Sequence, residues 1–114
     1  MNILLILKFI AAIGTILTGA VSLFWPSKVQ GFTGLSANGG RGLTEIRTIL
    51  GALFIALGAA ALYFNIPATY QMLGITYLTM AIIRGISMFI DKSVVSSNII
   101  SLAAELVFGL ILVL

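Results

Sequence analysis

The sequence contains neither cysteine nor histidine in its 114 residues. Their absence excludes thiol nucleophiles, disulfide bonds, histidine-bound zinc or haem, and Ser-His-Asp catalysis. Carboxylates are almost as scarce, because the acidic residues are Glu45, Asp91 and Glu105 alone. So few carboxylates, scattered along the chain, do not suit a carboxylate-caged metal ion or a two-carboxylate hydrolase. We therefore expect no metal, no cofactor and no enzymatic activity.

Charge as a whole is rare in this chain. Charged residues make up 8% of the sequence and hydrophobic residues 61%, with a mean hydropathy of +1.22, whereas a soluble domain has about 25% charged residues. This composition is typical of a protein in a lipid bilayer. The net charge of +3 comes from cations scattered between apolar runs, so it indicates membrane topology and no nucleic-acid partner.

Four apolar stretches are long enough to cross the hydrocarbon layer, which needs about 20 helical residues. They cover approximately residues 3–24, 43–64, 69–90 and 94–114. Short connections make consecutive helices antiparallel neighbours. The sequence thus predicts an all-α, integral membrane four-helix antiparallel bundle, with residues 1–114 as one domain. The first stretch is longer than the apolar core of a signal peptide and contains Lys8, so we expect it to be retained as a span.

Local signals mark the ends of these spans. Pro67 is placed to occupy the first turn of the third helix, because proline lacks the N–H that is unused there. Tyr63 and Tyr70 flank the same turn and are predicted to belong to the interfacial aromatic belt. Ser93 follows a charged break and is predicted to be the N-cap of the last helix.

The segment 25–42 is the one stretch with the composition of a loop, and we expect it to lie along the interface. Its Gly39-Gly40-Arg41-Gly42 run is open to two interpretations. The backbone could form an anion-binding nest for a lipid phosphate, or the glycines could form a flexible turn before a helix, which we favour.

Positive charge is distributed unevenly between the two sides of the predicted bundle. The first and third loops contain Lys28, Arg41 and Lys92, whereas the turn 65–68 has no charge. Because Lys and Arg favour the cytoplasmic side, we expect these two loops in the cytoplasm and both termini outside, in a bacterial inner membrane. Lys8 is expected to snorkel outward.

Glu105 lies about eleven residues into the last span, near the middle of the bilayer, where an ionised carboxylate costs roughly 2.5–3.5 kcal/mol. Ser101 and Gly109 lie one turn before and one turn after it. Small residues at this spacing indicate a close approach of another helix. We therefore expect Glu105 to face the interior of the bundle.

Two arginines are predicted to meet this carboxylate. Arg47 shares a helical stripe with Gly51, Phe54 and Gly58, and Arg84 shares one with Tyr77, Ala81 and Met88. The depths of Arg47, Arg84 and Glu105 are roughly 6, 9 and 16 Å at the helical rise, offsets that a guanidinium side chain can span. We predict a buried Arg47–Glu105–Arg84 network, with Tyr77 as a hydrogen-bonding member. The surplus positive charge could receive an anionic or hydrogen-bond-accepting ligand.

Structural explanations exist for each of these charges. The buried network could simply fix the register of the helices. Glu45 is expected in the first turn of the second span, where a carboxylate complements the helix dipole, and capping is favoured over a functional role. Asp91 and Lys92 are most simply loop charges.

Small residues also recur at helical spacing in the first two spans. They are Ala11, Thr15 and Gly19 in the first span and Ala52, Ala56 and Ala60 in the second. Such stripes favour close helix contacts, either within one chain or across a homodimer.

Three motifs resemble those of the domain-of-unknown-function 4345 family, which is related to the DoxX-like small bacterial membrane proteins. They are Thr44-Glu45-Ile46-Arg47 followed by Gly51, Ile83-Arg84-Gly85, and Ala104-Glu105-Leu106. The likeness covers nearly the whole chain. The resemblance implies a compact four-span bundle in which Glu45, Arg47, Arg84 and Glu105 occupy the family's motif positions, and it implies no established activity.

Three functions are compatible with these features. We favour a non-enzymatic protein that binds membrane lipid or an amphipathic small molecule, with Arg47, Arg84, Glu105, Tyr77 and Glu45 as candidate ligand-binding residues. The alternative is a small proton-coupled multidrug-type transporter that works as a dimer through Glu105, although such transporters carry their essential Glu in the first helix. A membrane enzyme would have no nucleophile or base beyond Glu105.

Overall fold

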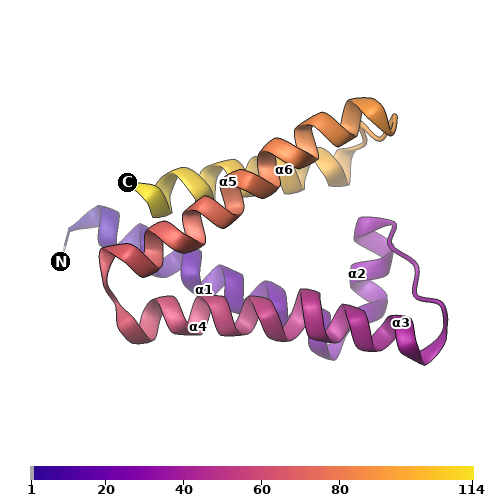
Figure 1. Ribbon diagram of the computed structural model, residues 1–114, viewed down its shortest axis with the longest axis horizontal. Helices are drawn as coiled ribbons and strands as arrows, with labels where there is room; N and C mark the ends of the chain where they lie inside the picture. Colours follow the sequence, from indigo (N-terminus) through magenta and orange to yellow (C-terminus); the bar gives the residue numbers. More distant parts are fainter. Residues whose placement is uncertain (1) are drawn as a thin grey trace. The chain divides into compact units, whose positions relative to one another are not determined.

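The computed structural model describes residues 2–114, and within them the secondary structure is entirely helical (Figure 1). The elements in chain order are α1 (Ile3–Phe24), α2 (Pro26–Thr33), α3 (Gly39–Glu45), the π-helical segment η1 (Ile46–Ala52), α4 (Leu53–Phe64), α5 (Pro67–Ile90) and α6 (Ser96–Val113). Because α3, η1 and α4 follow without a break, four helices are long and apolar enough to cross a membrane: Ile3–Phe24, Gly39–Phe64, Pro67–Ile90 and Ser96–Val113. The all-α prediction is confirmed.

The segment predicted to be a loop at 25–42 contains more helix than its composition indicated. Pro26 starts α2 in the first-turn position that suits proline. Gly34 ends α2 in the left-handed conformation, with φ of 75°, a conformation that glycine adopts without strain. The second span then begins at Gly39 rather than at residue 43, so the run Gly39-Gly40-Arg41-Gly42 is the first turn of α3. The favoured interpretation, a flexible turn, is therefore wrong, whereas the nest for a lipid phosphate stays a prediction.

The chain divides into two compact units, and each is described separately. The first unit consists of Met1–Ala11 together with Asn65–Leu114, and the second unit is Ala12–Phe64. The division therefore falls inside α1 and after α4. Arg84, Tyr77 and Glu105 belong to the first unit, and Arg47 and Glu45 belong to the second.

In the second unit, the later part of α1 packs against η1 and α4 through glycines. A Cβ atom built on Gly19 would lie 2.6 Å from the carbonyl oxygen of Gly51. The predicted stripe of Ala11, Thr15 and Gly19 is buried, as expected. The predicted stripe of Ala52, Ala56 and Ala60 is exposed instead. The partner stripe consists of Gly51 and Gly58, because these glycines let the two backbones approach most closely.

In the first unit, α5 and α6 form an antiparallel helical pair (Figure 1). Two glycines allow the close contact. A Cβ on Gly74 would lie 2.7 Å from a side-chain carbon of Val113, and one on Gly109 would lie 2.6 Å from a side-chain carbon of Leu78. The prediction that the face of Gly109 meets another helix is confirmed.

Tyr70, near the start of α5, does not lie in the interfacial belt that was predicted for it. Pro67 occupies the first turn as predicted, but Tyr70 is buried rather than part of an exposed belt. Its hydroxyl donates a hydrogen bond of 2.7 Å to the side-chain oxygen of Asn65, and its ring lies 6.3 Å from that of Phe9. The ammonium of Lys8 lies 5.9 Å from the centre of the same ring, within range of a cation–π contact, so Lys8 does not simply extend outward.

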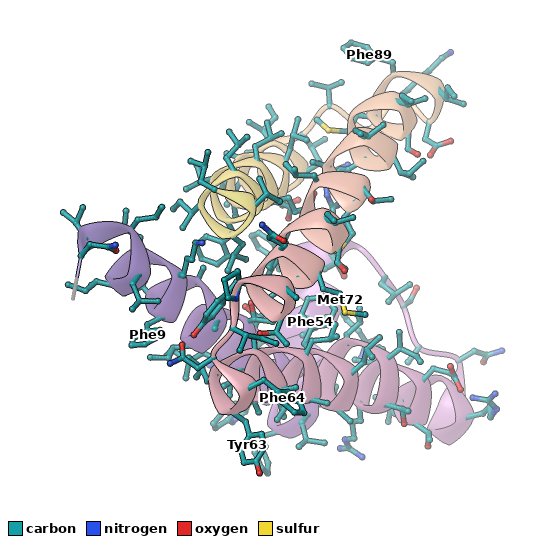
Figure 2. The ribbon with its side chains drawn as sticks, turned by 60° about the vertical axis from the view of Figure 1, so that its left-hand side comes forward. Phe9, Phe54, Tyr63, Phe64, Met72 and Phe89 are labelled. Carbon is teal, nitrogen blue, oxygen red and sulfur yellow. The ribbon has the colours of Figure 1, made fainter. Side chains whose placement is uncertain are left out.

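Much of the apolar surface of the helices is exposed, as suits contact with acyl chains. Figure 2 shows Tyr63 and Phe89 projecting away from the ribbon, and their exposed fractions are 83% and 80%. Between 17% and 28% of the most apolar window of each long helix is buried. In water such exposure would be unfavourable by about 25 cal/mol for each Å², so lipid is the medium that matches this surface.

Candidate functional site

The geometry of an arginine fork

Arg84 and Glu105 form the central ion pair of the first unit. The Arg84 Nε donates to Glu105 Oε1 at 2.8 Å, and an Nη of the same guanidinium donates to Oε2 at 2.9 Å. The Glu105 side chain is 6% exposed, whereas that of Arg84 is 32% exposed. Two parallel N–H···O bonds of this kind combine charge with a fixed planar geometry. This part of the predicted network is confirmed.

The predicted stripe explains why Arg84 points toward α6. Tyr77, Ala81 and Met88, which share its face of α5, are all buried. The same holds on α6, where Glu105 and Gly109 are both buried. Helical periodicity alone therefore placed these two ionised side chains on facing sides of one helical pair.

Asn98 extends the ion pair, and the sequence analysis missed it. Its side-chain oxygen accepts a hydrogen bond of 2.8 Å from the Arg84 guanidinium, and its side-chain nitrogen donates to the Ser93 carbonyl at 3.0 Å and hydroxyl at 3.2 Å. The signal was present, since Asn98 lies seven residues before Glu105 and thus on the same face of α6. These bonds join α5, the loop and the first turn of α6.

Ser93 is not the N-cap that its position indicated. The residue before α6 is Val95, and no side chain caps this helix. Ser93 lies instead at the end of α5, where its N–H donates to the Met88 carbonyl at 2.9 Å and Lys92 adopts a positive φ of 52°. This six-to-one bond resembles the Schellman way of ending a helix, and it leaves the Ser93 side chain available to Asn98.

Tyr77 is buried on α5 beside this cluster. Its ring meets that of Phe108 edge to face, with ring centres 5.6 Å apart. The contact fixes the orientation of the phenol, because edge-to-face geometry is favourable for aromatic pairs. A hydrogen bond from Tyr77 into the ion pair stays a prediction.

Arg47 lies in η1, in the other unit. The predicted stripe of Arg47, Gly51, Phe54 and Gly58 is wrong at its first member, because Ile46 is buried and Arg47 is exposed. The reason is a local change of period: the N–H of Leu53 bonds to the carbonyl of Thr48, five residues back, as in a π-helix. Ile46 is five residues before Gly51 and takes the buried position. The role of Arg47 in the network stays a prediction.

Glu45 does not occupy a first turn. It is the last residue of the seven-residue α3, and its carboxylate accepts a hydrogen bond from Arg41, one turn earlier. The two side chains are 53% and 77% exposed. The predicted capping role is therefore wrong, because the helix begins earlier than residue 43. An exposed pair of this kind contributes little to stability.

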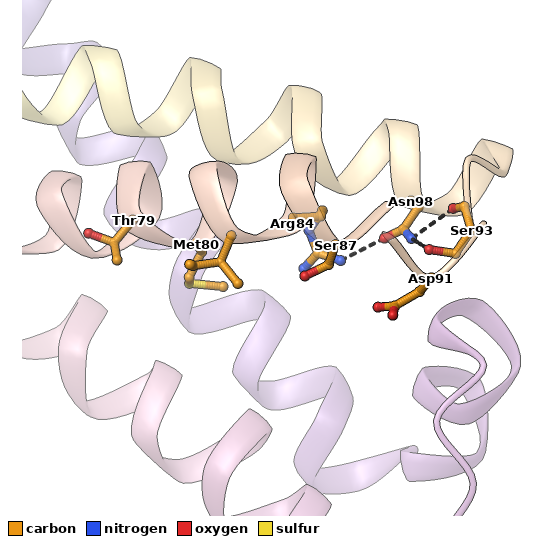
Figure 3. Close-up of a pocket in the computed structure, with 8 residues that line it drawn as sticks. Thr79, Met80, Arg84, Ser87, Asp91, Ser93 and Asn98 are labelled. Carbon is orange, nitrogen blue, oxygen red and sulfur yellow. Dashed lines mark hydrogen bonds between the residues drawn. The ribbon is translucent and has the colours of Figure 1, made fainter. Parts of the chain in front are cut away.

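A cleft of about 470 Å³ adjoins Arg84 in the first unit (Figure 3). Its lining consists of Thr79, Met80, Ile83, Arg84, Ser87, Asp91, Ser93 and Asn98. Figure 3 shows Ser87, Asp91, Ser93 and Asn98 toward the loop after α5, whereas Thr79 and Met80 lie earlier on α5. One end of the cleft is thus charged and hydrogen-bonding, whereas its flank contains apolar side chains.

Arg84 has more hydrogen-bond donors than Glu105 and Asn98 occupy. Three hydrogen bonds occupy three of the five N–H groups of Arg84, so two donors remain for a ligand. Among residues 2–114, no three acidic side chains gather in a way that would bind a metal ion.

Comparison with known proteins identifies no relative: no protein-family model matches the chain, nor does any curated protein or any solved structure. The class that sequence and fold define is that of a helical protein with four helices suited to crossing a membrane. The resemblance to the family of unknown function named above stays a prediction.

Proposed function

We propose that this protein is a non-enzymatic membrane protein that binds a lipid or another amphipathic small molecule in the cleft beside the Arg84–Glu105 pair. The observation that carries the proposal is the composition of the cleft. A guanidinium with two remaining donors lies at one end, and Met80 and Ile83 lie along α5. Binding sites for amphipathic molecules combine an apolar wall with a few polar groups that fix orientation.

The ion pair supports binding rather than proton-coupled transport. Both oxygens of Glu105 are engaged by Arg84, and the side chain is almost fully buried. An exchange site has to release its carboxylate to a substrate and to protons, which this bidentate contact opposes. For an enzyme, a hydroxyl nucleophile needs a base beside it, and among residues 2–114 no hydroxyl donates a hydrogen bond to Asp91, the carboxylate in the lining. Arg47, Tyr77 and Glu45 remain predicted members of the site from sequence alone.

The proposal is tested by filling the cleft. Ile83 lines it, whereas the neighbouring Ile82 does not, and the two side chains are similarly exposed at 59% and 63%. Ile83→Trp and Ile82→Trp thus form a matched pair on the same helix. Each protein is purified in detergent, stripped of lipid, and incubated with dioleoyl phosphatidylethanolamine and dioleoyl phosphatidylglycerol before native mass spectrometry.

We expect the unaltered protein and Ile82→Trp to retain one lipid through increasing collision energy, and Ile83→Trp to lose it. Equal retention by both tryptophan variants would exclude the cleft as the binding site. Complete absence of retained lipid in the unaltered protein would reject the proposal for both lipids. Circular dichroism of both variants establishes that their helices remain folded.

A further inference from the structure

The cleft contains a second ionised group whose charge the ion pair does not balance. Asp91 follows the last residue of α5 and lines the cleft. Its carboxylate is exposed and makes no hydrogen bond or ion pair with any residue in 2–114. Arg84, by contrast, is already matched by Glu105. The group of three therefore has a net charge of −1, located on Asp91.

This charge pattern selects among the polar ends that a ligand could offer. A purely anionic group would meet a guanidinium that is already neutralised and would be repelled by Asp91. A ligand whose polar end is only a cation would leave the two remaining donors of Arg84 without an acceptor. A zwitterion satisfies both ends, since an acidic oxygen can accept from Arg84 while an ammonium donates to Asp91.

The spacing and depth of the two residues suit a lipid headgroup. Asp91 lies seven positions after Arg84, about 10 Å along the helix axis, and seven residues are close to two full turns. Both side chains therefore leave α5 on the same side. Asp91 lies where a span gives way to a loop, the depth at which headgroups are found. Ile83 also lines the cleft and is exposed, so it offers an apolar surface to the acyl chains.

We infer that the cleft recognises an aminophospholipid of the phosphatidylethanolamine type, with the phosphate on the remaining N–H groups of Arg84 and the primary ammonium on Asp91. The inference rests on the proposed function and adds the class of ligand. A primary ammonium has three N–H donors for a carboxylate. The trimethylammonium of phosphatidylcholine has none, and phosphatidylglycerol lacks a cation.

The experiment measures the affinity of delipidated protein in detergent for dioleoyl phosphatidylethanolamine, phosphatidylcholine and phosphatidylglycerol. Asp91→Asn keeps the shape of the side chain and removes its charge, and Asp91→Glu restores the charge. Lys92→Asn removes the adjacent loop charge, which lies outside the lining of the cleft, and asparagine accepts the left-handed backbone at residue 92.

We expect the ethanolamine lipid to bind about tenfold more tightly than the other two, the ratio that corresponds to one charge-assisted hydrogen bond. Asp91→Asn should abolish this preference, Asp91→Glu should restore it in part, and Lys92→Asn should keep it. Water-soluble glycerophosphoethanolamine should compete poorly, because it has no acyl chain to place along Ile83.

Three results would overturn the inference. They are equal binding of the three lipids, a preference unchanged in Asp91→Asn, and competition by glycerophosphoethanolamine as strong as that by the lipid, which would indicate a soluble zwitterion as ligand. In each case, loss of binding in Ile83→Trp but not in Ile82→Trp would leave the proposed function intact. Failure of that matched pair would instead reject the proposed function itself.

Discussion

Gly58 of α4 lies so close to Ala12 of α1 that a Cβ atom on Gly58 would be 2.6 Å from the Ala12 carbonyl oxygen. The clash would be with backbone, which cannot move aside as a flexible side chain can. We expect Gly58→Ala to destabilise the second unit by about 1–3 kcal/mol, the usual effect of overpacking. Titration with a denaturing detergent, followed by circular dichroism, measures the change.

Gly85 provides the control for this substitution. A Cβ built there meets nothing within 4 Å, and Gly85 lies inside α5, where alanine is favoured over glycine by roughly 0.5–1 kcal/mol. Gly85→Ala should therefore leave stability unchanged or raise it slightly. Equal losses in Gly58→Ala and Gly85→Ala would show that helix packing at Gly58 is looser than the structure indicates.

The Arg84–Glu105 pair should respond strongly to removal of one partner. Arg84→Met leaves a buried carboxylate without its counter-charge, and we expect a loss of about 3–5 kcal/mol. Replacing both residues by methionine should recover most of this loss, because no uncompensated charge remains. The free energies of unfolding of Arg84→Met, Glu105→Met and the double variant give the coupling energy between the two residues.

The exposed Arg41–Glu45 pair is a matched comparison, because it also joins an arginine to a glutamate. Arg41→Met should change the free energy of unfolding by about 0.5 kcal/mol or less, since an exposed pair is screened by water. If Arg84→Met were as mild as Arg41→Met, the buried pair could not be the main polar link between α5 and α6.

The turn between α4 and α5 separates a backbone effect from a hydrogen bond. Asn65 has a positive φ of 50° and accepts the hydroxyl of Tyr70. Tyr70→Phe removes the hydrogen bond alone and should lower stability by about 1 kcal/mol. Asn65→Ala also introduces left-handed strain and should lower it further, whereas Asn65→Gly should behave like Tyr70→Phe. Thermal unfolding in detergent orders the three variants, and an Asn65→Ala variant no weaker than Tyr70→Phe would contradict the strain argument.

Membrane orientation can be tested cleanly because the chain has no cysteine. Single cysteines are introduced as Lys28→Cys and Ser97→Cys near the loops expected in the cytoplasm, and as Ala68→Cys in the uncharged turn. In intact bacterial cells, a membrane-impermeant maleimide should label Ala68→Cys and leave the other two unlabelled until the cells are opened. The reverse pattern would place the termini in the cytoplasm.

The sequence predicted those features that depend on hydropathy and on regular helical spacing. The four long helices follow from apolar length, and the contact of Arg84 with Glu105 follows from stripes of small residues on α5 and α6. In both cases the backbone keeps the period of 3.6 residues on which the reasoning relied.

The failures occurred where the backbone departs from that period or where a loop is ordered by its own contacts. Nothing in the side-chain pattern of residues 46–52 indicates i to i+5 hydrogen bonds, so Arg47 was placed on the wrong stripe. Asn98 was not predicted because only ionised groups were considered, although its spacing of seven residues from Glu105 places it on the same face of α6, where it is half-buried. The extent of α2 and α3 depends on the left-handed glycines Gly34 and Gly39, whose conformations composition does not reveal.

The π-helical turn of η1 also determines how α3, which precedes it in the same helix, is rotated about the helix axis. One residue corresponds to about 100° of rotation around an α-helix, so a turn that closes five residues back rotates α3 relative to α4. Loss of a single residue between Ile46 and Gly51 would therefore move Arg41 and Glu45 to a different side of the helix, while the glycine contacts at Gly51 and Gly58 kept their place. Length variation in this stretch would thus change which way the charged end of the helix points without altering how the helix is held.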